Sequence, residues 1–252
     1  MTIQIRAVYP LIRLTIVLAW MTLGCSAMYA GVMVLEPLAL ELGTGRGNSS
    51  LIYGSFMIGF ALGGVFMGRL ADRVGIMIPA IIGSLALPAG FYLAAHASSI
   101  LEISLAFSLL CGFLGSSFSM APLIADISHW FSRRRGLAVG IAFSGSYVAG
   151  AIWPPILQRM FDAQGWRESF IDLALLTLIL MALLSLLLYP KPTTNVQLTT
   201  AGSNNSNLTN SAISAGSLQS LICLAGFGCC VALAIPQLHL VPYVMALGHP
   251  AM

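Results

Sequence analysis

The stretch Gly68-Arg69-Leu70-Ala71-Asp72-Arg73-Val74-Gly75 lies between two apolar segments, 49–67 and 77–96. Each segment has about the 20 residues that an α-helix needs to cross a hydrocarbon layer. In a tight turn between two such helices, Gly68 and Gly75 allow a sharp backbone path. Asp72 can accept hydrogen bonds from free amides and pair with a nearby arginine. The stretch therefore predicts a membrane hairpin closed by a charged turn.

The composition also favours a lipid environment. Of the 252 residues, 58% are hydrophobic and only 8% are Asp, Glu, Lys or Arg, whereas soluble domains carry about 25% charged residues. The mean hydropathy is +0.91. So few charges cannot cover a soluble chain of this length, which excludes an ordinary soluble domain. The net charge is +3, but the basic residues are spread over short loops. We therefore expect the lipid bilayer as a partner and no nucleic acid.

Seven stretches are long and apolar enough to span a bilayer. They cover approximately 14–35, 49–67, 77–96, 101–128, 136–157, 168–189 and 219–241. Short connections between the first six make neighbouring helices antiparallel. From Thr193 to Ser217 the chain is polar and uncharged, which predicts a flexible linker over 191–218. The expected fold is an all-α membrane protein with a six-helix bundle over 1–190, this linker, and one further helix within 219–252.

The distribution of basic residues predicts a cytoplasmic N-terminus. In that orientation eight Lys or Arg residues lie inside and three outside, in agreement with the positive-inside rule. The inner set is Arg6, Arg13, Arg69, Arg73, Arg133, Arg134, Arg135 and Lys191, and the outer set is Arg46, Arg159 and Arg167. This orientation places both the 68–75 turn and the 191–218 linker in the cytoplasm.

Three consecutive arginines, Arg133, Arg134 and Arg135, begin a second informative stretch. At the inner membrane interface they fix the topology, and they can pair with anionic lipid or with the acid of the 68–75 turn. Asp126 has two interpretations. It is either a partner of Arg73 or of the arginine triplet in an inward gate, or an acid that is solvated at a helix end.

Small residues follow the arginines at helical spacing. One ridge consists of Gly136, Gly140 and Ser144, and a neighbouring one of Ala138, Ala142, Gly145 and Ala149, with Gly150 next along the chain. Such ridges let helix backbones approach closely. Pro154 and Pro155 remove two amide donors and should bend or end the helix. The proline pair is either part of a gate or a simple helix terminus.

The 68–75 turn resembles motif A of the major facilitator superfamily, Gly-x-Leu-Ala-Asp-Arg-x-Gly. In that family the loop latches the two halves of a carrier on the cytoplasmic side. The resemblance implies a cytoplasmic gate formed by Gly68, Leu70, Asp72, Arg73 and Gly75. The family motif usually ends in one or two basic residues. Here Ile76 and Met77 follow, which implies a weaker latch.

The stretch 130–155 is similar to the fifth helix of the monocarboxylate porter and oxalate-formate antiporter branch of this superfamily, and segments 161–167 and 237–243 also fit. The resemblance implies a secondary transporter of small organic acids, either mono- or dicarboxylates. Such a carrier works by symport or exchange with alternating access, with protons as one candidate coupling ion. Members have twelve helices, so this chain resembles a truncated carrier with the N-terminal half and the seventh helix. The expected location is the plasma membrane, the inner membrane in a bacterium.

In this superfamily the first and fourth helices line the central cavity, and the fifth and seventh contribute to it. The resemblance then implies a set of cavity-lining residues with apolar walls and a few polar tips. The set is Tyr29, Met33, Phe118, Tyr147, Gln237, His239 and Tyr243. An organic anion calls for a buried Arg or Lys, and no cation is expected deep in these spans.

Other functions lack the residues that they need. A retinal protein needs a lysine in its seventh span, but the only lysine is Lys191 in the linker. No histidine is placed for an intramembrane protease, and no glycine-rich phosphate loop exists. The five cysteines match no zinc pattern, so no metal is expected. With no catalytic arrangement and no phosphate loop either, neither an enzyme nor a cofactor is expected. Three alternatives stay open: a truncated fragment without transport, a half that needs a separate partner chain, and an efflux carrier for another solute.

Overall fold

The computed structural model describes residues 2–41, 43, 46–131, 134–188, 216–218, 220–221, 223–228 and 231–232. The chain divides into two units, Met1–Thr193 and Thr194–Met252. The described residues of the second unit are helical, and they include only part of the predicted seventh span at 219–241. Regular structure in the described ranges is helical throughout, so the predicted all-helical fold is confirmed.

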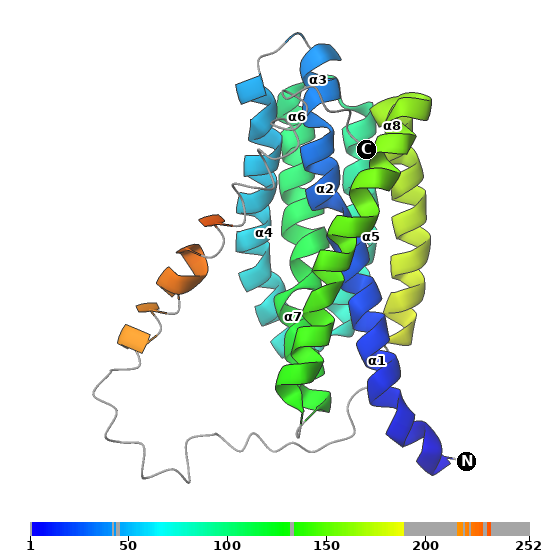
Figure 1. The fold of residues 1–252 in the computed structure, drawn as a ribbon, viewed down its shortest axis with the longest axis vertical. Helices are drawn as coiled ribbons and strands as arrows, with labels where there is room; N and C mark the ends of the chain where they lie inside the picture. Colours follow the sequence, from blue (N-terminus) through cyan, green and yellow to red (C-terminus); the bar gives the residue numbers. More distant parts are fainter. Residues whose placement is uncertain are drawn as a thin grey trace. The chain divides into compact units, whose positions relative to one another are not determined.

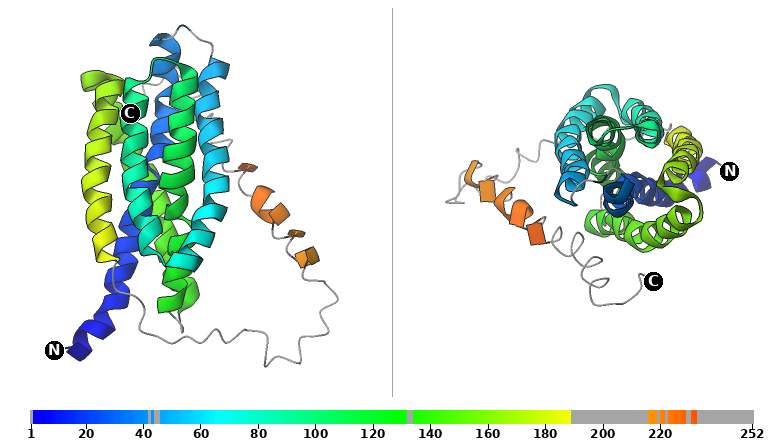
Figure 2. Two further views of the ribbon diagram at one scale, coloured as in Figure 1. Left: turned by 180° about the vertical axis from the view of Figure 1, so that it is seen from behind. Right: turned by 90° about the horizontal axis from the view of Figure 1, so that it is seen from above.

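The first unit is a single bundle of long helices (Figures 1 and 2). In chain order its elements are α1 (Thr2–Gly24), α2 (Ser26–Met33), α3 (Leu35–Glu41), α4 (Arg46–Val74), α5 (Met77–His96), α6 (Ile100–Leu105), the π-helix η1 (Ala106–Gly115), the 3₁₀-helix η2 (Ser116–Ser119), α7 (Ala121–Trp130) and α8 (Arg135–Leu187). Within the described residues, five helical stretches are long and apolar enough to cross a membrane: Tyr9–Met33, Ser50–Val74, Met77–His96, Ile100–Trp130 and Arg135–Leu187.

The element α8 consists of two helical arms joined at Gly165. A straight helix of its 53 residues would be about 80 Å long, far more than a hydrocarbon layer of ~30 Å. Gly165 has a φ of 83°, a left-handed conformation that glycine adopts without the steric penalty of a Cβ atom. Figures 1 and 2 show the two arms running from this turn in opposite directions along the bundle. The stretch Arg135–Leu187 therefore provides two crossings, corresponding to the predicted spans 136–157 and 168–189.

The proline pair does not end its helix. Pro154 and Pro155 lie inside α8, and the non-helical backbone comes only at Gly165. The expectation of a helix terminus at these prolines is therefore wrong. Two prolines are tolerated because neighbouring helices in a membrane can compensate for the lost main-chain hydrogen bonds. Close by, the indole Nε1 of Trp153 donates to the Thr22 carbonyl at 2.7 Å and ties this arm to α1.

One small-residue ridge forms the contact between α8 and α1. Ala138, Ala142 and Ala149 are buried, and Gly145 lies so close to α1 that an added Cβ would be 2.6 Å from the Leu18 carbonyl oxygen. Lipid provides no hydrophobic force between helices, so close backbone packing of this kind holds membrane bundles together. The ridge fixes the distance between the first crossing and the fifth.

Aromatic rings fill the interior on the other side of the bundle. Phe107 of η1 and Phe170 of α8 both contact Phe91 of α5 and each other, with ring centroids 5.6 to 6.2 Å apart. All three rings are fully buried. Tilted and edge-to-face arrangements at these separations are favourable for aromatic pairs. The cluster joins the third, fourth and sixth crossings.

Both the first and the fourth crossing are interrupted. A turn at Cys25 separates α1 from α2, and η1, η2 and the non-helical Met120 replace regular α-helix in the fourth. The interruptions touch each other, because the Ser116 hydroxyl donates to the Gly24 carbonyl at 2.7 Å. Ser117 of η2 also donates to the Phe113 carbonyl of η1. Such serine bonds to the backbone bend helices, which explains why the apolar stretch 101–128 is not a uniform α-helix.

We predict that Gly145→Ala and Gly140→Ala change stability in opposite directions. At Gly145 the new methyl group collides with the Leu18 carbonyl, and such overpacking costs about 1–3 kcal/mol. At Gly140 an added Cβ has open space, so the variant gains helix propensity of up to about 1 kcal/mol. The free energy of unfolding of the purified chain measures both effects. Equal effects would show that the two ridges do not differ in packing.

Candidate functional site

Most of the predicted 68–75 turn is helical. Gly68, Leu70, Asp72 and Arg73 lie in the last two turns of α4, and only Gly75 and the next residue separate α4 from α5. Gly75 has a φ of 87°, and its amide donates to the Ala71 carbonyl at 2.9 Å, which closes the helix end. The side chains of Asp72 and Arg73 are exposed. They are available to a partner outside this bundle.

A buried ion pair lies at the same end of the bundle as this turn. Arg13 of α1 donates from Nε to Asp126 Oδ2 at 2.6 Å and from Nη2 to Asp126 Oδ1 at 3.0 Å. The side chain of Arg13 is fully buried, and that of Asp126 is 9% exposed. Two parallel hydrogen bonds between a guanidinium and a carboxylate are the strongest geometry for this pair of groups. The pair links the first crossing directly to the fourth.

Aromatic and main-chain groups surround this pair. The guanidinium lies over the ring of Trp130, 4.9 Å from its centroid, and also donates to the Tyr9 hydroxyl and the Leu188 carbonyl. The Tyr9 hydroxyl in turn donates to the Leu187 carbonyl at 3.3 Å. Side chains and carbonyls from α1, α7 and the end of α8 thus share one charge cluster. We call Tyr9, Arg13, Asp126 and Trp130 the α1–α7 charge cluster.

The partner of Asp126 differs from the partners expected from the sequence. Arg73, Arg134 and Arg135 are exposed, whereas Asp126 is bonded to Arg13, and Arg133 lies outside the described residues. No cation is expected deep in the spans, and Arg13, which directly precedes the predicted span 14–35, is fully buried near the end of the first crossing. A signal was present in the sequence: Arg13 lies inside the apolar stretch Tyr9–Met33. A charge in that position needs an opposite charge on a neighbouring helix.

A groove between the fourth and fifth crossings carries one of the expected arginines. It has a volume of about 560 Å³. Its lining is Met120 from the break before α7, Ile124, Ala125 and Ser128 from α7, and Arg135, Val139 and Phe143 from α8. Arg135 donates to the Ser128 hydroxyl at 3.0 Å. The walls are otherwise apolar, so the groove combines one exposed cation with a surface for a hydrocarbon group.

The residues expected to line a cavity are dispersed. Tyr147 is 69% exposed, while Tyr29 and Met33 are half-buried against the core. Phe118 is fully buried, with its ring 5.4 Å from that of Trp20, so it belongs to the core instead of a cavity wall. None of these four lines the groove between α7 and α8. Gln237, His239 and Tyr243 lie outside the described residues.

The predicted packing glycines fall into two groups. Gly145 and Gly150 face α1 and α2, and an added Cβ at Gly150 would lie 2.6 Å from the Tyr29 hydroxyl. At Gly136 and Gly140 an added Cβ meets nothing within 4 Å. The second group therefore presents a flat, open surface on the arm that carries Arg135. In the described ranges, no group of three His, Cys, Asp or Glu side chains is placed to hold a metal ion.

A second polar anchor holds the opposite end of the bundle. Arg167 of α8 donates to Glu41 Oε1 at 2.9 Å and to the Ala95 and Ala97 carbonyls at 2.8 Å each. Trp166 donates to Glu41 Oε2 at 2.6 Å. Burial alone would raise the pKa of Glu41, but the hydrogen bonds from Trp166 and Arg167 and the guanidinium charge lower it overall. The anchor joins the ends of α3 and α5 to the start of the second α8 arm.

Helices long and apolar enough to cross a membrane, held together at both ends by polar anchors, are the features of a multi-pass membrane protein. Residues 15–252 match the Major Facilitator Superfamily, and the chain belongs to this family. The family consists of transporters of small molecules and not of enzymes, as the sequence predicted.

Several relatives are monocarboxylate transporters, which confirms the resemblance to that branch. Human monocarboxylate transporter 11 is 31% identical over 191 residues, 74% of this chain and 38% of the relative. The MFS-type transporter pytF of Aspergillus terreus is 38% identical over 120 residues, 46% of this chain and 40% of the relative. The riboflavin transporter RibJ of Trypanosoma cruzi is 36% identical over 108 residues, 42% of this chain and 23% of the relative. The chain spans about two fifths of the length of the first two.

We predict that Asp126→Asn and Arg13→Met each lower the free energy of unfolding by about 3–5 kcal/mol, because either change leaves a buried charge without its partner. The double variant Arg13→Met with Asp126→Leu should recover most of the loss, since it removes both charges. Arg73→Met, at an exposed position, is the matched control and should change stability little. If the double variant lost the sum of the single effects, the two side chains would not be coupled.

We predict a pH dependence for the anchor at Glu41. Because its pKa is lowered in the folded chain, the stabilisation is complete above the unfolded pKa of about 4.3 and is lost as the pH falls through the folded value. The melting temperature of the wild type should exceed that of Glu41→Gln at neutral pH, and the difference should shrink in acid. High salt should also narrow it, since both side chains are partly exposed. If the difference in melting temperature grew in acid, the pKa of Glu41 would be raised in the folded chain and not lowered.

Proposed function

We propose that the chain supplies the N-terminal six-helix half of a secondary carrier for small organic acids. Transport would proceed by symport or exchange, with alternating access to the two sides of the membrane. The observation that carries the proposal is the groove between α7 and α8, in which Arg135 is the only charged residue among the described lining residues. The monocarboxylate transporters among the relatives support the same substrate class.

The chemistry of the groove suits a carboxylate with a short hydrocarbon group. Arg135 offers a planar set of donors that matches the two oxygens of a carboxylate, and Ser128 offers a hydroxyl beside it. Met120, Ile124 and Phe143 form apolar walls for the remainder of the solute. In the structure Arg135 is bonded to a neutral hydroxyl and not to an acid. An incoming anion would therefore meet a cation whose charge is not already neutralised by that bond.

The rest of the bundle would act as the scaffold that moves. Alternating access rocks one half of such a carrier against the other around a central site. The α1–α7 charge cluster and the Glu41–Arg167 anchor would keep this half together during the movement. The exposed Asp72 and Arg73 at the end of α4 would meet the second half as a latch at the cytoplasmic surface. A half that requires a separate partner chain would use the same contacts.

A second candidate is an efflux carrier for another solute. It is favoured by a 36% identity over 136 residues to the agnestins efflux protein AgnL12 of Paecilomyces divaricatus, 52% of this chain and 31% of that protein. An efflux carrier for a neutral solute would not depend on the charge of Arg135. Whether transport depends on the Arg135 side chain therefore distinguishes the two candidates.

We predict that Arg135→Gln raises the KM for uptake of a monocarboxylate such as lactate by about ten- to a hundredfold. A hydrogen bond to a charged group contributes about 1.5–3 kcal/mol, which corresponds to a change of this size. The measurement is uptake of labelled lactate into proteoliposomes, with a form of the carrier in which the second half is present. Arg134→Gln is the matched control, because Arg134 is exposed and does not line the groove.

The outcomes separate the alternatives. Equal effects of Arg134→Gln and Arg135→Gln would remove the special role of Arg135. Transport of riboflavin or a neutral solute without transport of any carboxylate would favour the efflux candidate.

In the same assay Asp72→Asn should abolish uptake of every substrate while membrane insertion stays intact, because the latch acts on the movement and not on the solute. Unchanged uptake in Asp72→Asn would contradict the latch.

A further inference from the structure

The groove between α7 and α8 is polar at one end only. Arg135 and Ser128 form that end, where the guanidinium donates to the hydroxyl at 3.0 Å. The other described lining residues are apolar, namely Met120, Ile124, Ala125, Val139 and Phe143. A groove of this kind matches a solute that is charged at one end and hydrocarbon along the rest of its length.

The contact between Arg135 and Ser128 also sets the register of the two helices. Only residues 131–134 connect α7 to α8, so the two helices run in opposite directions. On each helix the lining continues eight residues away from this contact, to Met120 before α7 and to Phe143 on α8. Eight helical residues rise about 12 Å, which gives the length of the groove from its polar end to its apolar end.

The charges near the polar end favour an anion. Arg134 precedes Arg135 in the chain, is exposed and carries the same charge. Asp126 is the only acid of α7, and its carboxylate is already bonded to the buried Arg13. A carboxylate that reaches Arg135 therefore meets a positive charge that no acid of α7 neutralises.

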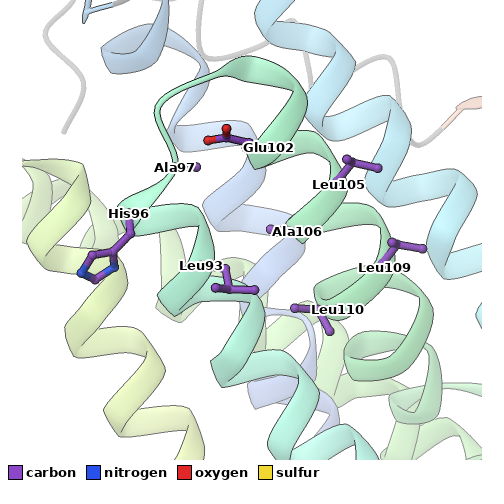
Figure 3. Close-up of a pocket in the computed structure, with 8 residues that line it drawn as sticks. All are labelled: Leu93, His96, Ala97, Glu102, Leu105, Ala106, Leu109 and Leu110. Carbon is purple, nitrogen blue, oxygen red and sulfur yellow. The ribbon is translucent and has the colours of Figure 1, made fainter.

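A second groove, between α5 and the stretch formed by α6 and η1, has the opposite charge. Its volume is also about 560 Å³, but the charged side chain among its described lining residues is the acid Glu102. Figure 3 shows Glu102 at one end of the set that lines it. Arg167 bonds the Ala97 carbonyl at this groove, and its charge is already paired with Glu41. The second groove therefore suits a carboxylate poorly and provides an internal control.

We propose that the groove between α7 and α8 selects acids with a single carboxylate and an unbranched chain of about six to eight carbons. This inference rests on the proposed function and narrows its substrate class. With C–C bonds of about 1.5 Å, an extended chain gains about 1.3 Å for each carbon, so eight carbons span about 10 Å. The carboxylate bonds Arg135, and the methyl end lies between Met120 and Phe143. A second carboxylate at that end would lose hydration beside apolar walls without gaining a cation.

The test is equilibrium dialysis of radiolabelled acids against the purified 252-residue chain in phosphatidylcholine nanodiscs, with the uptake by protein-free nanodiscs subtracted. Full burial of one methylene strengthens binding about fourfold, and a groove open on one side gives about half of that free energy, or about twofold. Octanoate should therefore bind roughly tenfold to twentyfold more tightly than butyrate. Octanedioate has the same length and a second carboxylate, and should bind about tenfold more weakly than octanoate.

Ala125→Trp tests the apolar part of the groove separately from its cation. Ala125 lines the groove between its two ends and is exposed, so the indole fills the space beyond the first carbons of the chain. The variant should lower the ratio of octanoate to butyrate affinity to about one. Leu109→Trp is the matched control, because it fills the second groove from a position that is 55% exposed and should leave this ratio unchanged.

The outcomes distinguish this inference from the proposed function. Equal binding of butyrate and octanoate, or equal losses in Ala125→Trp and Leu109→Trp, would overturn the selection for chain length. Lactate uptake that depends on Arg135 would survive that result, and the proposed function with it. Binding of no carboxylate at all would overturn both. Displacement of octanoate by phosphatidylglycerol added to the nanodiscs would assign the groove to an anionic lipid and also overturn the inference.

Discussion

The organisation of this helical bundle depends on one buried ion pair. Arg13 and Asp126 lie in an apolar bundle, where a charge without a partner is very costly. Their cost is offset only because the guanidinium meets the carboxylate with two hydrogen bonds and also bonds Tyr9 and the Leu188 carbonyl. That geometry requires α1, α7 and the end of α8 to occupy fixed positions. The pair is therefore a constraint on the whole end of the bundle at which α4 ends.

The two polar anchors and the broken helices have complementary effects. Each end of the bundle is held by an arginine, Arg13 at one and Arg167 at the other. Between the ends, the first and fourth crossings lose regular α-helical geometry at Cys25 and Met120. Interrupted helices are a recurring feature of binding sites in transporters. Under the proposed function, the anchored ends would let the bundle move as a unit, and the interrupted helices would let its middle adapt to a solute.

The arginines of this chain divide into structural and available charges. Arg13 and Arg167 are each bonded to an acid and to main-chain carbonyls. Arg135 is exposed and bonded to a serine in an apolar groove. Sequence position does not separate these classes, since all three directly precede a predicted span, namely 14–35, 136–157 or 168–189. The two classes differ in whether an acid on a neighbouring helix is bonded to the arginine. Asp126 is such an acid and is already bonded to Arg13, so it is not available as a gate partner.

The sequence by itself determined the membrane setting, the helical class, the positions of the first six crossings and the family, because these follow from apolar length, charge scarcity and local motifs such as 68–75. It also marked Arg135 and Asp126 as residues of interest. Only the tertiary structure decided that Asp126 pairs with Arg13, that Phe118 belongs to the core, and that the helix continues past Pro154 and Pro155. These outcomes depend on which helices are neighbours and how each is rotated. Contacts between residues more than a hundred positions apart set both, and no local pattern encodes them.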